Sequence, residues 1–564
     1  MVSILISWVL ITIVLITFGK LLLQILSSVI KQDTRYNVCD TFFLGLCSFG
    51  TFLSIASLFF PLNGLFILTL SITVSICYFT YKVFKGKPQK LLNNLKPVSL
   101  FSKILIVLFI IIAILFALLP PLNFDTGLYH LQAMMWAESY PVIPGLANLH
   151  GRFGFNSNAL LIHSVFSFND IFPSRVYSLH SLSFIVLFGW IIYKIARSKE
   201  FFIQISLVLL CIAFFICYEY SISSPSTDEL ANILVVYLFL RIILDKDALK
   251  KSPLLFAIIP VFCLTLKLST GLLCIFTLIV LIQLIRTKQY KLFSAILLAG
   301  CVIFIPWCVR NVIMTGYLIY PFPAIDIFSY DWKIPAALVE NEKTLVTWFA
   351  RLCGVGQEDP PYPPFAIWSK KWLIQHATMV KSNFVIDVLA IISPLSILLA
   401  YKLKYIKNFS AIYPWLVAFA GTLFWAFMAP DERFGFGFIV IAALAPFMLF
   451  NIEVKNKIWL KVPQILLLVF FVYSIQKGFK LIEKHRSDRT YISFLYEPQS
   501  IEFVKNYAST HGFRSYRLDD IIIYTPILSQ RCFDHELPCA VEYTNNIEMR
   551  GKSIEDGFRP KMIE

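Results

Sequence analysis

The chain has 564 residues, of which 58% are apolar, 16% are aromatic and only 15% are charged. A soluble domain carries about 25% charged residues, so this composition excludes an ordinary water-soluble protein. The high apolar content excludes intrinsic disorder, and 12 cysteines are too few for a small disulfide scaffold. The composition therefore predicts an all-α polytopic membrane protein.

The formal net charge of +15 lies in the first 478 residues, because residues 479–564 hold 12 basic and 13 acidic side chains. A basic excess between apolar segments is typical of cytoplasmic loops. A nucleic-acid-binding surface would show a basic stripe with interleaved aromatic residues on a soluble segment, and the sequence has none. We therefore expect the lipid bilayer, and no nucleic acid, as a partner.

Apolar stretches close to the length of about 20 residues that crosses a bilayer recur along the chain. The first starts at the N-terminus without a basic leader and is too long for a signal peptide, so we expect a retained helix. Several stretches are short and closely spaced, which gives about fourteen helices within a range of twelve to fourteen. They lie near residues 2–26, 41–60, 62–80, 101–119, 174–193, 201–218, 229–244, 253–266, 268–285, 291–308, 384–400, 411–428, 434–451 and 462–476.

The lysines predict the orientation of these helices. Between the third and fourth helices, six lysines from Lys82 to Lys103 occur without an acidic residue, which indicates a cytoplasmic loop. Alternation from this loop places five further basic turns inside. It places outside the segments 120–173, 219–228, 309–383, 429–433 and the tail from about 477. We therefore expect a transmembrane domain over 1–478, with large outer loops at 120–173 and 309–383, and a small extracytoplasmic segment over 479–564.

The first outer loop follows a very apolar helix and begins with Asp125, Tyr129 and His130. Residues 126–140 have the apolar spacing of a short helix that lies in the membrane interface. Asp125 would either cap this helix or share a face with Tyr129 in a binding site. The polar cluster that follows in the same loop favours the binding site.

That polar cluster covers residues 150–158 and contains His150, Arg152 and Asn156 beside two glycines. The guanidinium of Arg152 is a planar fork that suits a phosphate or a carboxylate. Its alternative role is to anchor lipid head groups at the membrane surface.

Asp228 and Glu229 begin a helix at another outer turn, directly after Ser226 and Thr227. The serine or the threonine would cap the helix, and acids in the first turn complement the helix dipole. Two adjacent carboxylates would equally hold a divalent ion or orient a hydroxyl nucleophile.

Basic residues occur at three more outer turns, although such side chains also often extend to the lipid surface. Because all these charges share one side of the membrane, we expect them to meet at one pocket at membrane level. The helix interiors are nearly free of charge, with Lys20 as the main exception. The basic residues at the three outer turns mentioned above are Lys267, Arg310 and Arg433.

Two cysteines in the tail, Cys532 and Cys539, are close enough to close a small disulfide loop, which an exported compartment permits. The acids and the histidine between them offer a metal site as the alternative, but a paired Cys/His pattern is missing. We favour the disulfide.

Several segments resemble a family of uncharacterised bacterial multi-pass membrane proteins related to the GT-C superfamily of membrane glycosyltransferases. The similar segments are 124–130, 145–154, 532–539 and 550–558. The resemblance implies a GT-C-like helical bundle in the bacterial cytoplasmic membrane, an outward-facing site and a lipid-phosphate sugar donor. Asp125 matches the acid that would act there as a base or as a metal ligand.

The expected function is a membrane glycosyltransferase that transfers a sugar from a polyprenyl-phosphate donor to a cell-envelope glycan or lipid acceptor. Asp125 would deprotonate the acceptor or hold a divalent cation, Mg²⁺ or Mn²⁺, with Asp228 and Glu229 as second candidates. The alternatives are an envelope polysaccharide polymerase or ligase and, less favoured, a flippase or transporter, which needs polar residues near the midplane. The expected substrate-binding residues are Tyr129, His130, His150, Arg152, Asn156, Lys267, Arg310 and Arg433.

Overall fold

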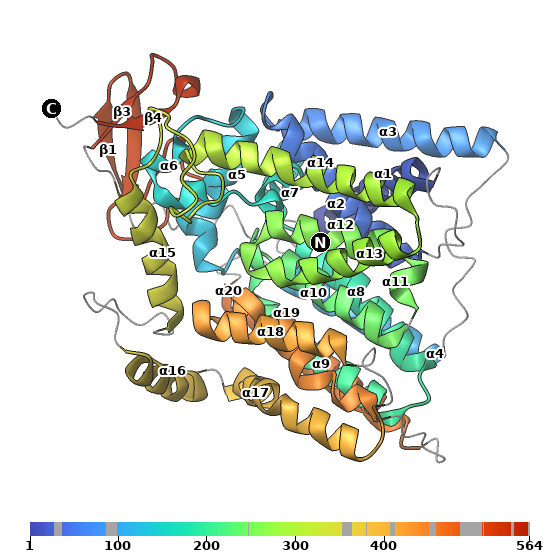
Figure 1. Cartoon of the computed structure of the whole chain (residues 1–564). Coiled ribbons are helices and arrows are strands. Elements are labelled where there is room, and N and C mark those ends of the chain that lie inside the picture. The colour runs from blue at the N-terminus through green and yellow to red at the C-terminus, as the bar shows by residue number, and fades with distance from the viewer. Residues whose placement is uncertain are drawn as a thin grey trace.

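The computed structural model of the chain is mostly helical, with two small two-stranded sheets, in agreement with the predicted all-α class. Its helices fill most of the molecule, and the strands are confined to the C-terminal part (Figure 1). The structure describes residues 1–27, 36–85, 99–245, 247–351, 364–379, 381–406, 412–450, 458–485, 510, 512–542 and 546–561.

Within the described residues, eleven helical segments are long and apolar enough to cross a membrane, so the chain is a multi-pass membrane protein. Three shorter helices occupy the other predicted positions: α10 (Asp228–Leu244), α12 (Pro253–Leu266) and α18 (Tyr413–Met428). The number of about fourteen spans stays a prediction. The eleven segments contain α1 (Val2–Ser27), α2 (Val38–Ala56), α3 (Gly64–Phe84), α4 (Leu100–Ala117), α8 (Leu179–Arg197), α9 (Phe201–Tyr218), α13 (Cys274–Arg286), α14 (Tyr290–Thr315), α17 (Lys381–Lys402), α19 (Glu432–Leu444) and α20 (Lys461–His485).

Close packing of the helices depends on small residues where backbones meet. Between α1 and α2, a Cβ atom on Gly45 would lie 1.7 Å from the carbonyl oxygen of Leu15, and one on Gly19 would lie 2.0 Å from that of Thr41. Small residues allow such approach in membrane helix pairs, where the apolar lipid supplies little drive for association. At the centre of the bundle, α10 is buried on all sides, which explains why it is apolar around its whole circumference.

The elements that do not span the bundle gather mainly at one end, on the left of Figure 1, which we call the loop end. A short helix, α11 (Ala248–Lys251), lies at the opposite end. The loop end carries α5 (Leu131–Ser139), α6 (Leu146–Leu149), α7 (Asn158–Val165), α15 (Ala336–Arg351), α16 (Phe365–Met379), β1 (Phe513–Leu518), β2 (Ile521–Pro526), β3 (Ile547–Met549) and β4 (Phe558–Pro560). Both strand pairs, β1–β2 and β3–β4, are antiparallel.

The C-terminal segment packs on the loop that follows α4. The side chain of Gln132 in α5 donates hydrogen bonds to the carbonyl oxygens of Phe533, at 3.1 Å, and His535, at 2.8 Å, and accepts one from the backbone of Cys539. Cys539 forms a disulfide with Cys532. The predicted short helix is present as the π-helical turn Thr126–His130 and α5, and its apolar side chains are covered by protein.

The expectation that Lys20 is the main charge inside the helices is wrong. Asp40 in α2 and Arg241 in α10 form a buried ion pair, with 3.0 Å between Nε and Oδ1. A third charged residue, Asp387, lies buried in α17. Asp40 and Arg241 are 201 residues apart in the chain, so the hydrophobicity of either segment gives no sign that its charge is paired.

Candidate functional site

Asp125 lies at the loop end, directly before a π-helical turn over Thr126–His130. Its side chain does not cap this turn, so the capping interpretation is excluded. Instead, its Oδ2 atom accepts a hydrogen bond from Nη1 of Arg433 at 3.0 Å, and its Oδ1 atom lies 3.5 Å from Nη1 of Arg152. Two of the predicted cations, from distant parts of the chain, thus contact the predicted carboxylate.

The N-terminal turn of α19 positions Arg433. Asp431 caps this helix by accepting from the backbone N–H of Arg433, and its other carboxylate oxygen accepts from the guanidinium Nε at 3.2 Å. The carbonyl oxygen of Arg433 accepts hydrogen bonds from the hydroxyl of Tyr218 and from the amide of Asn232. The backbone and the guanidinium are both held, so Arg433 points at Asp125 in a fixed direction.

Arg152 belongs to a 3₁₀ turn, Gly151–Gly154, that packs against α15. A Cβ atom on Gly151 would lie 2.6 Å from Oε1 of Glu342, so any larger residue here would require the Glu342 side chain to move. Arg152 Nε lies 3.9 Å from Glu342 Oε2, and its guanidinium lies over the ring of Tyr129, at 5.9 Å from the ring centre. Burial raises the pKa of Glu342 against the opposing effect of Arg152. Glu342 is a contact that the sequence did not indicate.

A second ion pair joins Asp228, at the start of α10, to Lys267. At the start of this helix, the hydroxyl of Ser226 accepts a hydrogen bond from the backbone N–H of Asp228 at 3.3 Å. Thr227 makes no capping hydrogen bond with its side chain. The ammonium of Lys267 lies 3.9 Å from the centre of the Phe434 ring, and the guanidinium of Arg433 lies 5.3 Å from the same ring. The two ion pairs are therefore neighbours on one aromatic ring.

His130 is surrounded by these charges. Its side chain is only 2% exposed, and neither ring nitrogen has a hydrogen-bond partner among the described residues. Burial lowers the pKa of His130 to about 4, so the ring is neutral at pH 7. Asp125 and Asp228 oppose this effect, whereas Arg433 and Lys267 add to it. A neutral imidazole with an open donor and acceptor thus lies in the centre of the ion pairs.

The pKa of Asp125 reflects the same surroundings. Burial alone would raise it, but Arg433, His130 and Arg152 together lower it below the usual value. The carboxylate is ionised at neutral pH and is a weak base while both arginines hold it. The side chains of Arg433, at 25% exposure, and Arg152, at 24%, are still open to a ligand.

We call this group the Asp125 cluster. It combines carboxylates, cations and a neutral imidazole at one end of the bundle, which is the chemistry needed to bind an anionic group beside a hydroxyl. It consists of Asp125, Tyr129, His130, Arg152, Asp228, Lys267 and Arg433.

Other predicted residues make their contacts elsewhere. Arg310 is buried, donates to Asn156 Oδ1 at 3.1 Å and to the Ser57 hydroxyl at 2.6 Å, and lines a cavity of about 30 Å³ with Asn156. Within the part of the chain that the structure describes, these two residues form no hydrogen bond or ion pair with the Asp125 cluster. Five of the expected charged residues therefore lie together, whereas Arg310 does not join them. The reason is that Arg310 lies within α14 and is held by its own neighbours.

The two remaining predicted residues, His150 and Glu229, contact other neighbours, and Glu229 is buried. The ring of His150 packs on Phe153, with 5.3 Å between ring centres, and burial lowers the pKa of His150 to about 3. Glu229 is 1% exposed and interacts with Ser221 and Ser226. Among the described residues, neither side chain forms a hydrogen bond with Arg152, Lys267 or Arg433.

Among the described residues, one group has the composition and spacing of metal ligands, and the sequence did not predict it. His376, Asp387 and Glu432 offer ligand atoms that all lie within 4.8 Å of one another. The sequence signal was Asp387, an acid inside an apolar span, where charged residues are expensive and often functional. Glu432 lies within the short segment 429–433, which the sequence predicted to be an outer turn.

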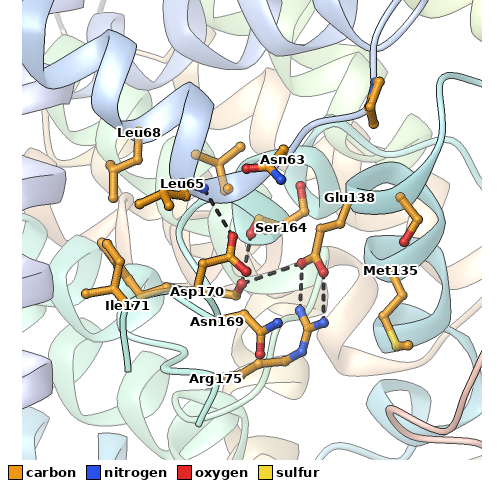
Figure 2. A pocket seen from close by; sticks show the side chains of 16 residues that line it. Asn63, Leu65, Leu68, Met135, Glu138, Ser164, Asn169, Asp170, Ile171 and Arg175 are labelled. Carbon is orange, nitrogen blue, oxygen red and sulfur yellow. Dashed lines mark hydrogen bonds and ion pairs between the residues drawn. The ribbon is translucent and has the colours of Figure 1, made fainter. Parts of the chain in front are cut away.

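A cavity of about 450 Å³ lies between the start of α3 and the segment between α4 and α8 (Figure 2). Glu138 and Arg175 form a bidentate ion pair in its wall, at 2.6 and 2.8 Å, and Asp170 accepts from the backbone of Leu65. None of the predicted site residues lines it. The cavity and the Asp125 cluster are therefore separate features.

Comparison with known families gives one match. Residues 1–440 match the family model described as a domain of unknown function, DUF8201. The chain belongs to this family. No curated protein and no solved structure shows a significant match to the chain. The family match covers both arginines of the Asp125 cluster, Arg152 and Arg433, and ends before the C-terminal strands.

Proposed function

We propose that this chain is a membrane glycosyltransferase that transfers a sugar from a polyprenyl-phosphate donor to a cell-envelope glycan or lipid acceptor on the extracytoplasmic side. The observation that carries the proposal is the convergence of Arg152 and Arg433 on Asp125, beside the Asp228–Lys267 pair. A lipid-linked donor stays in the bilayer, so its phosphate must be met at the end of the membrane helices.

In this proposal the two arginines bind the donor phosphate. Both guanidiniums are about a quarter exposed, and each has free N–H directions beyond its contact with Asp125 because guanidinium carries five donors. A phosphate bound between the two guanidiniums partly neutralises their positive charge and so weakens their interaction with Asp125. The pKa of Asp125 then rises from its lowered value, so the carboxylate becomes a stronger base when the donor is bound.

Asp125 then accepts the proton of the acceptor hydroxyl. The acceptor oxygen forms a bond to the anomeric carbon, and the bond from that carbon to the phosphate oxygen breaks. Arg152 and Arg433 stabilise the negative charge that develops on the leaving phosphate. Asp228, held by Lys267, orients the acceptor, and the neutral ring of His130 offers a hydrogen bond to either substrate.

The test uses Asp125→Asn in the native host. We expect the affected surface glycan to decrease at least about a hundredfold, the usual lower effect of losing a general base, while the protein inserts at its normal level. Asp326→Asn is the matched control, because Asp326 is an exposed carboxylate paired only locally with Lys333. The measurements are membrane protein level and surface glycan composition.

Normal glycan with normally inserted Asp125→Asn protein would contradict the proposed base. An envelope polysaccharide polymerase or ligase is the second candidate, because three cations in one cluster also suit a pyrophosphate. It predicts that Asp125→Asn keeps its activity, whereas Arg433→Gln loses it. The two variants together therefore distinguish the two enzymes.

A further inference from the structure

We propose that His376, Asp387 and Glu432, together with Asn383, bind one divalent transition-metal cation, Zn²⁺ or Mn²⁺. The four residues come from three helices at the loop end: α16, the start of α17 and the first residue of α19. This site is separate from Asp125 and from the expected Mg²⁺ or Mn²⁺ ligands Asp228 and Glu229. It goes beyond the proposed sugar transfer and does not depend on it.

The ligand atoms converge closely. His376 Nε2 lies 2.6 Å from Asp387 Oδ2 and 2.7 Å from Glu432 Oε1. The amide of Asn383 reaches the other oxygen of Glu432 at 2.5 Å. One imidazole nitrogen and two carboxylates thus face a common centre, and the amide nitrogen of Asn383 holds the other oxygen of Glu432.

Hydrogen bonds do not satisfy this arrangement. A single N–H on Nε2 can serve only one of the two carboxylates, and the bond goes to Asp387. Asp387 Oδ1, Glu432 Oε1 and Asn383 Oδ1 are buried and have no hydrogen-bond partner in the described structure. Asp387 and Asn383 are each only 3% exposed, so solvent does not replace the missing donors. A cation at the centre would satisfy these oxygens at once.

The charges point to the same conclusion. Two buried carboxylates face one imidazole, which carries at most one positive charge, so the group needs either an added proton or a bound cation to avoid an excess of buried negative charge. Imidazole nitrogen with carboxylate and amide oxygens is a donor set that suits Zn²⁺ and Mn²⁺ better than Mg²⁺ or Ca²⁺, which take oxygen ligands.

The neighbouring contacts hold the ligands in place. The ring of Trp372 stacks on His376, with 4.4 Å between ring centres, and its indole N–H donates to the carbonyl of Pro430 at 2.8 Å. Pro430 leads into the same turn that carries Glu432 and, one residue later, Arg433. The bound cation would therefore stabilise the turn that presents Arg433 to Asp125.

The test measures metal directly in the full-length chain, purified in detergent with an affinity tag that contains no histidine. The protein is washed with a chelator, titrated with Zn²⁺ or Mn²⁺ alone, and analysed by elemental mass spectrometry and calorimetry. We expect one equivalent of Zn²⁺ or Mn²⁺ per chain in the wild type. We expect His376→Gln and Asp387→Asn to weaken binding at least tenfold, while the control Asp326→Asn binds as the wild type.

The wild-type measurement is decisive even if a variant fails to fold. Absence of a stoichiometric ion in the wild type overturns the proposal, as does wild-type affinity in a folded His376→Gln protein. Co²⁺ as a spectroscopic probe gives a second readout, because ligation by His376 would produce visible absorption bands that are absent in His376→Gln. Metal content is measured without any transfer assay, so failure here and failure of the glycosyltransferase proposal are distinguishable.

Discussion

Two ion pairs in this protein use the same chemistry and differ in how completely they are satisfied. Asp40 is fully buried, and its carboxylate accepts from Arg241 Nε at 3.0 Å, from Nη2 at 3.3 Å, from the Tyr237 hydroxyl at 2.7 Å and from the backbone of Asn37 at 2.8 Å. Four donors reach one carboxylate. This pair links α2 to α10 and leaves nothing for a ligand to bind.

The Asp125 cluster is the opposite case. Asp125 is 16% exposed, its contact with Arg152 is long, and the His130 ring at its centre lacks hydrogen-bond partners in the described residues. Burial of a charged side chain is therefore not itself a sign of function, because Asp40 is the more buried of the two carboxylates and has no open position for a ligand. A fully satisfied pair fastens helices together, whereas an incompletely satisfied one keeps the capacity to bind a substrate.

The largest effect on stability is expected from Asp40→Asn. This change leaves the buried guanidinium of Arg241 without its main counter-charge, which costs about 3–5 kcal/mol in comparable buried pairs. Thermal unfolding of the purified protein in detergent checks it. The double variant Asp40→Asn/Arg241→Met should recover much of the loss. If Asp40→Asn unfolds at the wild-type temperature, the assignment of this pair as a structural link is wrong.

A medium effect is expected from pH through His130. Its folded pKa of about 4 lies below the ordinary 6.5, so the unfolded chain binds more protons between these values. The stability from the neutral ring is present above about pH 6.5 and is lost as the pH falls toward 4. Lowering the pH from 7 to 5 should cost about 2 kcal/mol.

The His130→Gln variant isolates this contribution, because glutamine keeps a polar side chain but does not titrate. We expect a smaller loss of stability between pH 7 and pH 5 in the variant, measured as the difference in unfolding temperature at the two pH values. An identical pH dependence in the two proteins would show that His130 is not buried in its neutral form.

The smallest effect is expected from Arg152→Gln, which should change stability by about 1 kcal/mol or less. Its pairs with Asp125, at 3.5 Å, and Glu342, at 3.9 Å, are long and partly exposed, and such pairs contribute little. The same thermal unfolding assay gives the value. A loss as large as that of Asp40→Asn would place Arg152 with the structural pairs and remove the contrast between the two regions.

Much of the fold was predictable because a membrane helix is specified locally. A run of apolar residues of sufficient length must satisfy its own backbone hydrogen bonds in lipid, so it forms a helix whatever lies beside it. A helix occurs at each predicted position in the described chain, although boundaries moved, as in α8, which starts at Leu179 instead of near 174. The contact of residues 126–140 with the C-terminal segment was not predictable, because that segment is some 400 residues away in the chain.

The sequence by itself determined the class of protein and the residues that share the loop end, since hydrophobicity and the alternation of helices depend on neighbouring residues only. The tertiary structure alone decided which charges meet. Asp125 forms an ion pair with Arg433, which is 308 positions away. Arg310 donates hydrogen bonds to Asn156 and Ser57 instead. His376 lies beside Asp387 and Glu432. Such partners are chosen by helix packing across the whole chain, and no local pattern of residues carries that information.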